Sequence, residues 1–232
     1  MDPEEAILSS TDSPDLPRIT DGVFFTTPAR LPKGPHGLSR DEVREIQRER
    51  LMIAYTELVA AHGYHDVGVR DLVARSTMSR SAFYDCFENL DLCADAAYQR
   101  FITVLLTEMT SQLTRTAVSH DIPVLIGAYL GTLQRDLVVA RAFQLEFDAA
   151  GRTARRRRRD ALRLMAEFLR AEHNKLAADD PTLDPDLDLE VFLGAIYAIR
   201  QLTSDLLDTE DEPDLSVLLP RVSEWLTNGL QR

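Results

Sequence analysis

Residues 39–93 read SRDEVREIQRERLMIAYTELVAAHGYHDVGVRDLVARSTMSRSAFYDCFENLDLC, and this stretch decides the fold. Its apolar spacing and its breaks predict a long helix that stops at Gly63, two short helices joined by a tight turn, and the start of another long helix. Two short helices joined in this way form a helix-turn-helix, whose second helix enters the major groove of DNA. We therefore interpret residues 39–92 as a DNA-binding domain.

Capping residues mark the ends of these helices. Ser39, followed three residues later by Glu42, predicts a capping box at the start of the long helix. Gly63 suits its end, because glycine readily adopts the left-handed backbone found there. Ser79 is the expected cap of the second short helix, over residues 80–87.

The second short helix has one apolar face. Phe83 and Phe87 are four residues apart and therefore share the face that packs inside. The other faces carry small and polar side chains that are free to touch a partner. An arginine there can donate two hydrogen bonds to guanine, and the backbone amides at a helix start favour phosphate. The candidate contacts are Arg80, Ser81, Ala82 and Tyr84.

Four segments of this stretch resemble the DNA-binding domain of the tetracycline-repressor (TetR) family. They are Gly63-Tyr64, residues 69–74, residues 78–89, and residues 47–51, which are similar to the first helix of that family. The resemblance implies a DNA-binding site made of Arg44, Arg48, Gly68, Val69, Ser79, Arg80, Ser81, Ala82, Tyr84 and Asn89.

The same resemblance implies how such a protein works. It implies a homodimer in which the last two long helices of each chain pack as a four-helix bundle. Its partner is a palindromic double-stranded DNA operator, with one recognition helix in each of two successive major grooves. A small effector would bind among the middle helices and shift the protein away from its DNA-binding state. Since most members of the family are repressors, repression is the expected activity.

Three positions depart from the pattern of that family. Gly68 stands in place of a capping threonine, Thr77 in place of a turn glycine, and Leu90 in place of a lysine that contacts phosphate. Residues 39–93 also hold 7 Lys and Arg against 10 Asp and Glu. Because phosphate contacts supply most of the non-specific affinity for DNA, we expect modest affinity that depends on the specific contacts.

The region before the helix-turn-helix is rich in proline. Residues 1–38 contain six prolines and no helical period, which predicts a flexible N-terminal tail. Its last part, residues 29–37, is basic. That part could reach a phosphate or the minor groove, or it could be an ordinary solvated linker.

Residues 93–232 are expected to form a helical domain for ligand binding and dimerisation. Apolar residues recur at helical spacing over residues 124–150, until Gly151 breaks the pattern, and again over residues 189–207 and 215–230. Polar, proline-containing loops separate the last helices. The fold class is therefore all-α, with about nine helices in total.

A run of five arginines over residues 155–159 lies at the start of one of these helices. It could bind an anion, a nucleic acid or a protein partner. The simpler interpretation is a solvated face that balances the acidic remainder of the chain.

Candidate pocket residues are the aromatic and polar groups on the middle helices, although each could equally be an ordinary core residue. Their mixture predicts a mainly apolar effector, with Arg200 available for one anionic group. Glu146 and Asp148 would instead favour a cation. The candidates are Phe101, Met109, Tyr129, Phe143, Phe147, Phe168, Tyr197 and Arg200.

Composition excludes several other classes of protein. The chain has 232 residues, a formal net charge of −12 and a pI of about 4.9, which argues against a non-specific nucleic-acid binder. It contains neither a secretory signal nor an apolar run long enough for a membrane helix, so we expect a cytoplasmic protein. Cys86 and Cys93 are expected to be free thiols. The five histidines and the two cysteines lack metal-ligand spacing, and we predict no metal and no cofactor.

Two alternatives to a DNA-binding regulator remain. An all-helical enzyme is disfavoured, because the sequence contains no recognisable nucleophile–base arrangement, phosphate-binding loop or metal triad. A helical interaction or sensor protein of the same fold, with weak or lost DNA binding, is compatible with the acidic balance and with Leu90.

Overall fold

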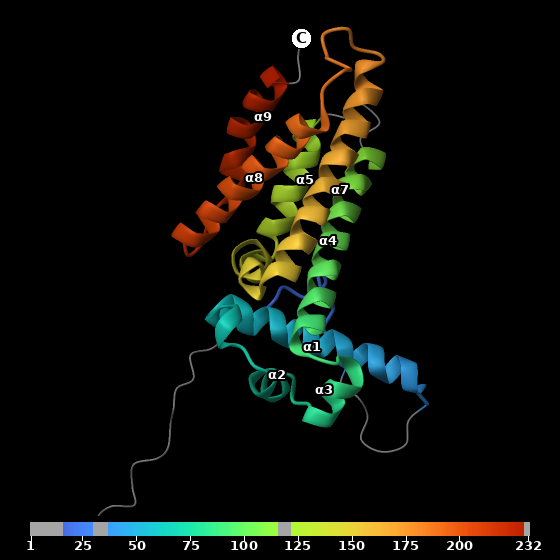
Figure 1. Ribbon diagram of the computed structural model, residues 1–232, viewed down its shortest axis with the longest axis vertical. Helices are drawn as coiled ribbons and strands as arrows, with labels where there is room; N and C mark the ends of the chain where they lie inside the picture. The colour runs from blue at the N-terminus through green and yellow to red at the C-terminus, as the bar shows by residue number, and fades with distance from the viewer. Residues whose placement is uncertain (1–15, 30–36, 116–121, 230–232) are drawn as a thin grey trace, which may run out of the picture.

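A computed structural model describes residues 16–29, 37–115 and 122–229 (Figure 1). The protein is all-α, as predicted. The described residues form nine α-helices and four short 3-10 or π-helical segments. The α-helices are α1 (Arg40–His62), α2 (Val69–Ser76), α3 (Arg80–Cys86), α4 (Leu90–Arg115), α5 (Ile122–Gln134), α6 (Leu137–Arg141), α7 (Arg152–Ala177), α8 (Leu189–Thr209) and α9 (Leu218–Gly229). The short segments are η1 (Tyr64–Asp66), η2 (Ala142–Glu146), η3 (Phe147–Ala150) and η4 (Leu215–Val217).

The helices form a base and a bundle above it. Helix α1 crosses the molecule near its lower end, with α2 and α3 beneath it (Figure 1). Helix α4 rises from this base and packs against α5 and α7, while α8 packs against α7. Helix α9 lies against α5 and α8. The long helix α4 therefore belongs to both parts and connects them.

The predicted helix ends are present. Ser39 Oγ accepts from the backbone N–H of Glu42, and the Glu42 carboxylate accepts from the N–H of Ser39 at 2.7 Å. Gly63 ends α1 with a φ of 78°, a backbone conformation that favours glycine. Ser79 Oγ accepts from the N–H of Ala82 at 3.1 Å and caps α3. These local interactions fix both ends of α1 and the start of α3.

The expectation of a flexible tail over residues 1–38 is wrong for residues 16–29, which pack against the folded protein. The side chains of Phe24 and Phe25 are 2% and 1% exposed. The ring of Phe24 lies 5.3 Å from that of Phe101 on α4, centre to centre. Two adjacent phenylalanines add enough apolar surface to fix a segment that its prolines alone would leave extended. Residues 30–36, most of the basic part of this tail, lie outside the described residues.

Backbone N–H groups of residues 16–29 also bind carboxylates of α1 and of the loop before α6. The N–H of Thr20 donates to Asp136 Oδ2 at 2.8 Å, and that of Ile19 donates to Glu57 Oε1 at 3.2 Å. Burial raises the pKa of Asp136 to about 6, although its backbone hydrogen bonds oppose this shift. We call residues 16–29 the N-terminal strap, because they connect α1 to the bundle.

The turn between α2 and α3 places a threonine in a left-handed conformation. Thr77 has φ 56° and ψ 37°, and it is the one residue other than glycine with positive φ among the described residues. A β-branched side chain is strained there, because its Cβ approaches the neighbouring backbone. The threonine that stands in place of the family's turn glycine therefore strains this turn.

Thr77→Gly should raise the free energy of unfolding by about 1 kcal/mol, since the strain removed exceeds the added freedom of the unfolded chain. Urea denaturation would measure the change. Thr77→Ala retains a Cβ and serves as the control, with little expected gain. A glycine variant no more stable than the alanine variant would contradict this account of the turn.

The apolar stretch over residues 124–150 is divided rather than continuous. Helix α5 ends at Gln134, and Asp136 then starts α6 by accepting from the N–H of Val139 at 3.1 Å. Helix α6 runs into the π-helical η2 and the 3-10 segment η3 before Gly151, with a φ of 94°, ends the series. A buried carboxylate that caps a helix explains the division, and hydrophobic periodicity does not reveal it.

The five arginines of residues 155–159 lie on the first turns of α7, and four of them contact acidic residues or backbone carbonyls. Arg157 pairs with Asp95 on α4 at 3.1 Å, and Arg158 pairs with Asp148 on η3 at 2.6 Å. Arg156 lies 3.9 Å from Asp160, and Arg155 donates to the carbonyl of Asp148 at 3.2 Å. These contacts support the interpretation of a solvated, charge-balanced face.

Candidate DNA-binding surface and ligand cavity

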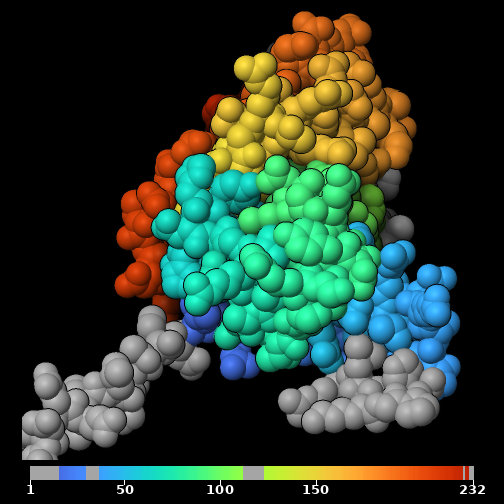
Figure 2. Space-filling model, turned by 60° about the horizontal axis from the view of Figure 1, so that its bottom comes forward, coloured from blue at the N-terminus to red at the C-terminus, as the bar shows by residue number. Residues whose placement is uncertain are grey.

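Helix α3 presents a polar face because its apolar face is buried. Phe83 is fully buried and Cys86 is nearly so, whereas the side chain of Tyr84 is 56% exposed. Arg80 and Ser81 are exposed on the first turn of the helix. Figure 2 shows α1, α2 and α3 together on the face of the molecule that lies at the bottom of Figure 1. The predicted recognition residues of α3 are therefore accessible, apart from Ala82, which is half-buried.

The two arginines predicted on α1 differ in their surroundings. Arg44 is exposed. Arg48 donates to the carbonyl of Cys86 at 2.7 Å, and its guanidinium carbon lies 4.2 Å from the centre of the Phe87 ring. A cation held over an aromatic face in this way stabilises the packing of α1 on the end of α3. Arg48 thus has a structural role that its position in the sequence did not indicate.

Three further predicted DNA-binding residues lie at the starts of α2 and α4, where each has a local contact within the protein. The N–H of Gly68 donates to Asp71 Oδ2 at 3.0 Å at the start of α2. Val69 is half-buried against the core. Asn89 Oδ1 accepts from the N–H of Leu92 at 2.9 Å at the start of α4. Arg70, the residue after Val69 on α2, is also exposed, although it is not among the predicted DNA contacts.

Other arginines close to this surface form ion pairs within the protein. Arg75 on α2 pairs with Glu57 on α1, with N and O 2.6 Å apart. Arg100 on α4 pairs with Glu49 on α1 at 3.2 Å. Because these cations already have carboxylate partners, they add little to the attraction of phosphate.

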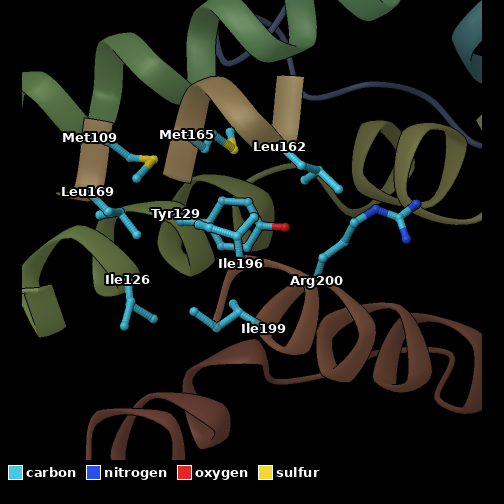
Figure 3. A pocket seen from close by; sticks show the side chains of 9 residues that line it. All are labelled: Met109, Ile126, Tyr129, Leu162, Met165, Leu169, Ile196, Ile199 and Arg200. Carbon is cyan, nitrogen blue, oxygen red and sulfur yellow. The ribbon is translucent and has the colours of Figure 1, made fainter. Parts of the chain in front are cut away.

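The bundle contains a small apolar cavity with buried lining residues, shown in Figure 3. Its volume is about 20 Å³, which is room for about one water molecule. A ligand larger than water therefore requires the surrounding helices or side chains to move. The cavity is lined by Met109 on α4, Ile126 and Tyr129 on α5, Leu162, Met165 and Leu169 on α7, and Ile196, Ile199 and Arg200 on α8.

Polar groups gather at one end of this cavity. The hydroxyl of Tyr129 accepts from Gln144 Nε2 at 2.9 Å, and Arg200 donates to the carbonyl of Gln144 at 2.8 Å. Burial raises the pKa of Tyr129 to about 12, so its hydroxyl keeps its proton at neutral pH. Gln144 Oε1 is buried and has no hydrogen-bond partner among the described residues. A buried acceptor without a partner is costly, and a ligand could relieve that cost.

The structure brings three of the eight predicted ligand-binding residues to the cavity, namely Met109, Tyr129 and Arg200. The six Leu, Ile and Met residues that complete the lining were not predicted, because an apolar cavity residue has the same pattern as a core residue. Two predicted residues lie elsewhere, with Tyr197 37% exposed on α8 and Phe168 half-buried on α7.

The remaining predicted aromatic residues form a packed cluster between α4 and the η2–η3 segment. The ring of Phe147 stacks on Tyr98, with the ring centres 3.8 Å apart and the planes at 7°. The rings of Phe101 and Phe143 lie 5.1 Å apart. The side chains of this cluster do not line the cavity.

Neither acidic residue named as a candidate for binding a cation lines the cavity. Asp148 pairs with Arg158. The Glu146 carboxylate faces the end of α1 and accepts from the N–H of Tyr64 at 3.4 Å. Asp148 also lies 3.9 Å from Arg200, so the carboxylate nearest the cavity already has two arginine neighbours, which disfavours a cationic effector.

Other kinds of site find no support in the described residues. Cys86 and Cys93 are buried free thiols, and burial raises the pKa of both, which disfavours the reactive thiolate. Across the described residues, His, Cys, Asp and Glu form no group of three that could hold a metal ion. No helix in that part of the chain combines the length and the apolar character needed to span a bilayer.

Comparison with solved structures shows which fold the chain has. No family model matches the sequence, and no curated protein matches it. The fatty acid degradation regulator FadR from Bacillus halodurans aligns with a TM-score of 0.71 and 18% identity, over 87% of this chain and 100% of that one. A transcriptional regulator FadR from Bacillus subtilis, solved in complex with stearoyl-CoA, gives 0.69 and 17%, over 78% and 98%. A TetR-family regulator from Pectobacterium atrosepticum gives 0.60 and 18%, over 84% and 98%.

The chain therefore has the fold of an all-α transcriptional regulator with an N-terminal helix-turn-helix. Within that class it has the TetR-family fold, which confirms the resemblance found in residues 63–89 at the level of structure.

Proposed function

We propose that the protein is a ligand-responsive transcriptional regulator that binds a palindromic DNA operator as a homodimer. The observation that carries this proposal is the exposed face of α3, where Arg80, Ser81 and Tyr84 project from a helix held by the buried Phe83. A short capped helix of this kind fits the major groove. Within the TetR fold, we expect the protein to repress transcription in the cytoplasm. We assign it no catalytic activity and no cofactor.

Selection of bound sequences from a random pool of DNA duplexes tests this function. We expect enrichment of a motif with two inverted half-sites, because a twofold-symmetric dimer presents two equivalent α3 helices. The selection should be performed at low salt, where weak phosphate contacts count most. Absence of any enriched motif under these conditions would refute the proposed function.

The proposed dimer interface lies on α8 and α9. Large apolar side chains are exposed there, including Leu202 on α8 and Trp225 on α9, which is 52% exposed. Exposed apolar groups that recur on neighbouring helices are typical of a protein–protein interface. The last two long helices are therefore our proposed site of self-association, with Val191 and Tyr197 on the same helix as Leu202.

Trp225→Glu should raise the dissociation constant of the dimer by at least about tenfold, because a buried tryptophan is a frequent energetic centre of an interface. Analytical ultracentrifugation over a range of concentrations would measure the effect. The control is Leu92→Glu, an equally drastic change at an exposed leucine on the first turn of α4. Equal dimerisation of both variants and the wild type would place the interface elsewhere.

We propose that the effector is small and mainly apolar, and that it binds in the cavity among α4, α5, α7 and α8. The aliphatic lining supports this proposal. The stearoyl-CoA in the structure of the Bacillus subtilis regulator carries a long apolar acyl chain, so a protein of this fold is known with such a chain in its ligand. Binding would enlarge the small cavity and, through α4, change the position of α3 relative to the α3 helix of the other subunit. DNA affinity would then fall.

A second candidate function is that of a helical interaction or sensor protein with weak or lost DNA binding. The specific observation in its favour is that Arg48, Arg75 and Arg100 are engaged inside the protein and do not project toward a partner. The duplex selection separates the two candidates, because only the first predicts a palindromic motif.

A further inference from the structure

Arg200 both lines the cavity and forms a hydrogen bond with η2. Its side chain lines the cavity, yet its guanidinium points away from the other lining side chains and toward the η2–η3 segment (Figure 3). There it donates to the carbonyl oxygen of Gln144 at 2.8 Å and lies 3.9 Å from Asp148. Arg200 is only 9% exposed. At 3.9 Å the Asp148 carboxylate is too far away for a close charge-assisted hydrogen bond. It therefore offsets little of the free energy that burying the guanidinium charge costs.

The lining of the cavity favours an aliphatic chain. Leu162, Met165 and Leu169 follow one face of α7 over two turns, which corresponds to about 10 Å along the helix axis. Seven of the nine lining residues are Leu, Ile or Met. Met side chains change shape easily, so Met109 and Met165 can move aside for a chain that lies along α7.

The polar end of the cavity is suited to a carboxylate. The Tyr129 hydroxyl and the Arg200 guanidinium are both hydrogen-bond donors at this end. Gln144, only 5% exposed, has a side-chain oxygen without a partner among the described residues. That oxygen is an acceptor and offers nothing to a carboxylate, so the head group would be bound by the two donors, Tyr129 and Arg200.

The same polar end connects to the DNA-binding helices. Gln144 lies in the π-helical η2, and Glu146 at the end of η2 faces the junction of α1 and η1. A Cβ atom at Gly63 would lie 3.2 Å from Glu146 Oε2, so the two segments are in close contact. Tyr64, the next residue, donates through its hydroxyl to Asp91 on α4 at 2.7 Å. A shift of η2 therefore acts directly on the residues that precede α2 and α3.

We propose that the effector is an aliphatic chain ending in a carboxylate. This carboxylate accepts the hydrogen bond that Arg200 otherwise donates to the backbone carbonyl of Gln144. Loss of that hydrogen bond releases η2 from its contact with Gly63 and Tyr64. The inference rests on the proposed ligand cavity and specifies both its ligand and its route to the DNA-binding helices. Ser204, which donates weakly to the same carbonyl at 3.4 Å, would keep only part of the original anchor.

Calorimetric titration of the full-length protein with three ten-carbon probes tests the ligand. Decanoate, 1-decanol and decyltrimethylammonium share the chain and differ in the head group. We expect decanoate to bind at least about tenfold more tightly than decanol, because hydrogen bonds to a charged partner are the stronger kind. Equal affinities, tighter binding of the ammonium compound, or binding of none of the three would overturn the proposed ligand.

Variants assign the preference to Arg200. Arg200→Met should bring decanoate and decanol to similar affinity, whereas Arg200→Lys keeps the charge and should retain a reduced preference for decanoate. Arg163→Met, the same change at an exposed arginine on α7 outside the cavity, should bind as the wild type. If Arg200→Met does not fold, the lysine variant and the comparison of probes with the wild-type protein still decide the question. Full preference for decanoate in Arg200→Met would overturn the role of Arg200.

Amide hydrogen exchange tests the route without any DNA. Saturating decanoate should increase exchange in residues 142–148 and in residues 61–66, and unliganded Arg200→Met should show part of the same increase. Unchanged exchange in residues 61–66 at saturation would overturn the coupling. If exchange changes but no DNA duplex is bound or released, the failure lies with the proposed regulatory function, and the coupling stands.

Discussion

Arg80→Ala should reduce specific binding to the selected operator by about 30-fold or more, to near the non-specific level. A bidentate arginine–guanine pair contributes about 1–3 kcal/mol of base discrimination, and a dimer loses one pair at each half-site. Arg80 is exposed on the first turn of α3, so its removal leaves the packing of the domain unchanged. Fluorescence anisotropy at constant salt would measure affinity, and circular dichroism would check that the fold is retained.

The control for this prediction is Arg156→Ala. Arg156 is also a solvent-exposed arginine on the first turns of a helix, but it lies on α7 and its side chain is 78% exposed. Its replacement should leave operator affinity unchanged. Tyr84→Ala on α3 should weaken binding as Arg80→Ala does. An Arg80→Ala protein that binds like the wild type would show that the recognition helix has been misplaced.

Phe25→Ala should lower the free energy of unfolding by about 3–5 kcal/mol, the usual cost of removing a fully buried phenylalanine. Phe25 is 1% exposed and belongs to the same core as α1 and α4. That loss is a large part of the stability of an ordinary domain. Urea denaturation followed by circular dichroism would measure it.

Thr26→Ala is the matched control in the N-terminal strap. Thr26 is exposed, and its backbone N–H, which donates to Glu49 at 3.1 Å, is retained in the alanine variant. We expect a change of less than about 0.5 kcal/mol. If Phe25→Ala were as mild as Thr26→Ala, the strap would not contribute to the core.

Features that depend on neighbouring residues could be predicted from the sequence. The capping box at Ser39, the end of α1 at Gly63 and the Ser79 cap all involve hydrogen bonds or backbone angles within about four residues. The burial of Phe83 beside an exposed Tyr84 follows from helical periodicity in the same way. The candidate DNA-binding face could therefore be identified, although its contact with an operator stays a prediction.

Features that depend on segments far apart in the chain could not be predicted from the sequence. The sequence predicts Arg48 as a DNA contact, but it does not reveal the contacts of Arg48 with Cys86 and Phe87, about forty residues further along the chain. The sequence predicts Tyr197 as a pocket residue, but its side of α8 is exposed and it does not line the cavity. Cavity residues such as Met165 have the pattern of any core residue, so their role depends on how four helices meet.

The sequence by itself determined the helix-turn-helix, with its caps, its strained turn at Thr77 and its polar recognition face. Each of these rests on interactions within a few residues, which the local order of side chains specifies. Only the tertiary structure decided that the strap at Phe25 belongs to the core and that Arg200 links the cavity to η2. The reason is that the partner of a buried apolar or charged side chain is chosen by the packing of segments far apart in the chain, which no local pattern records.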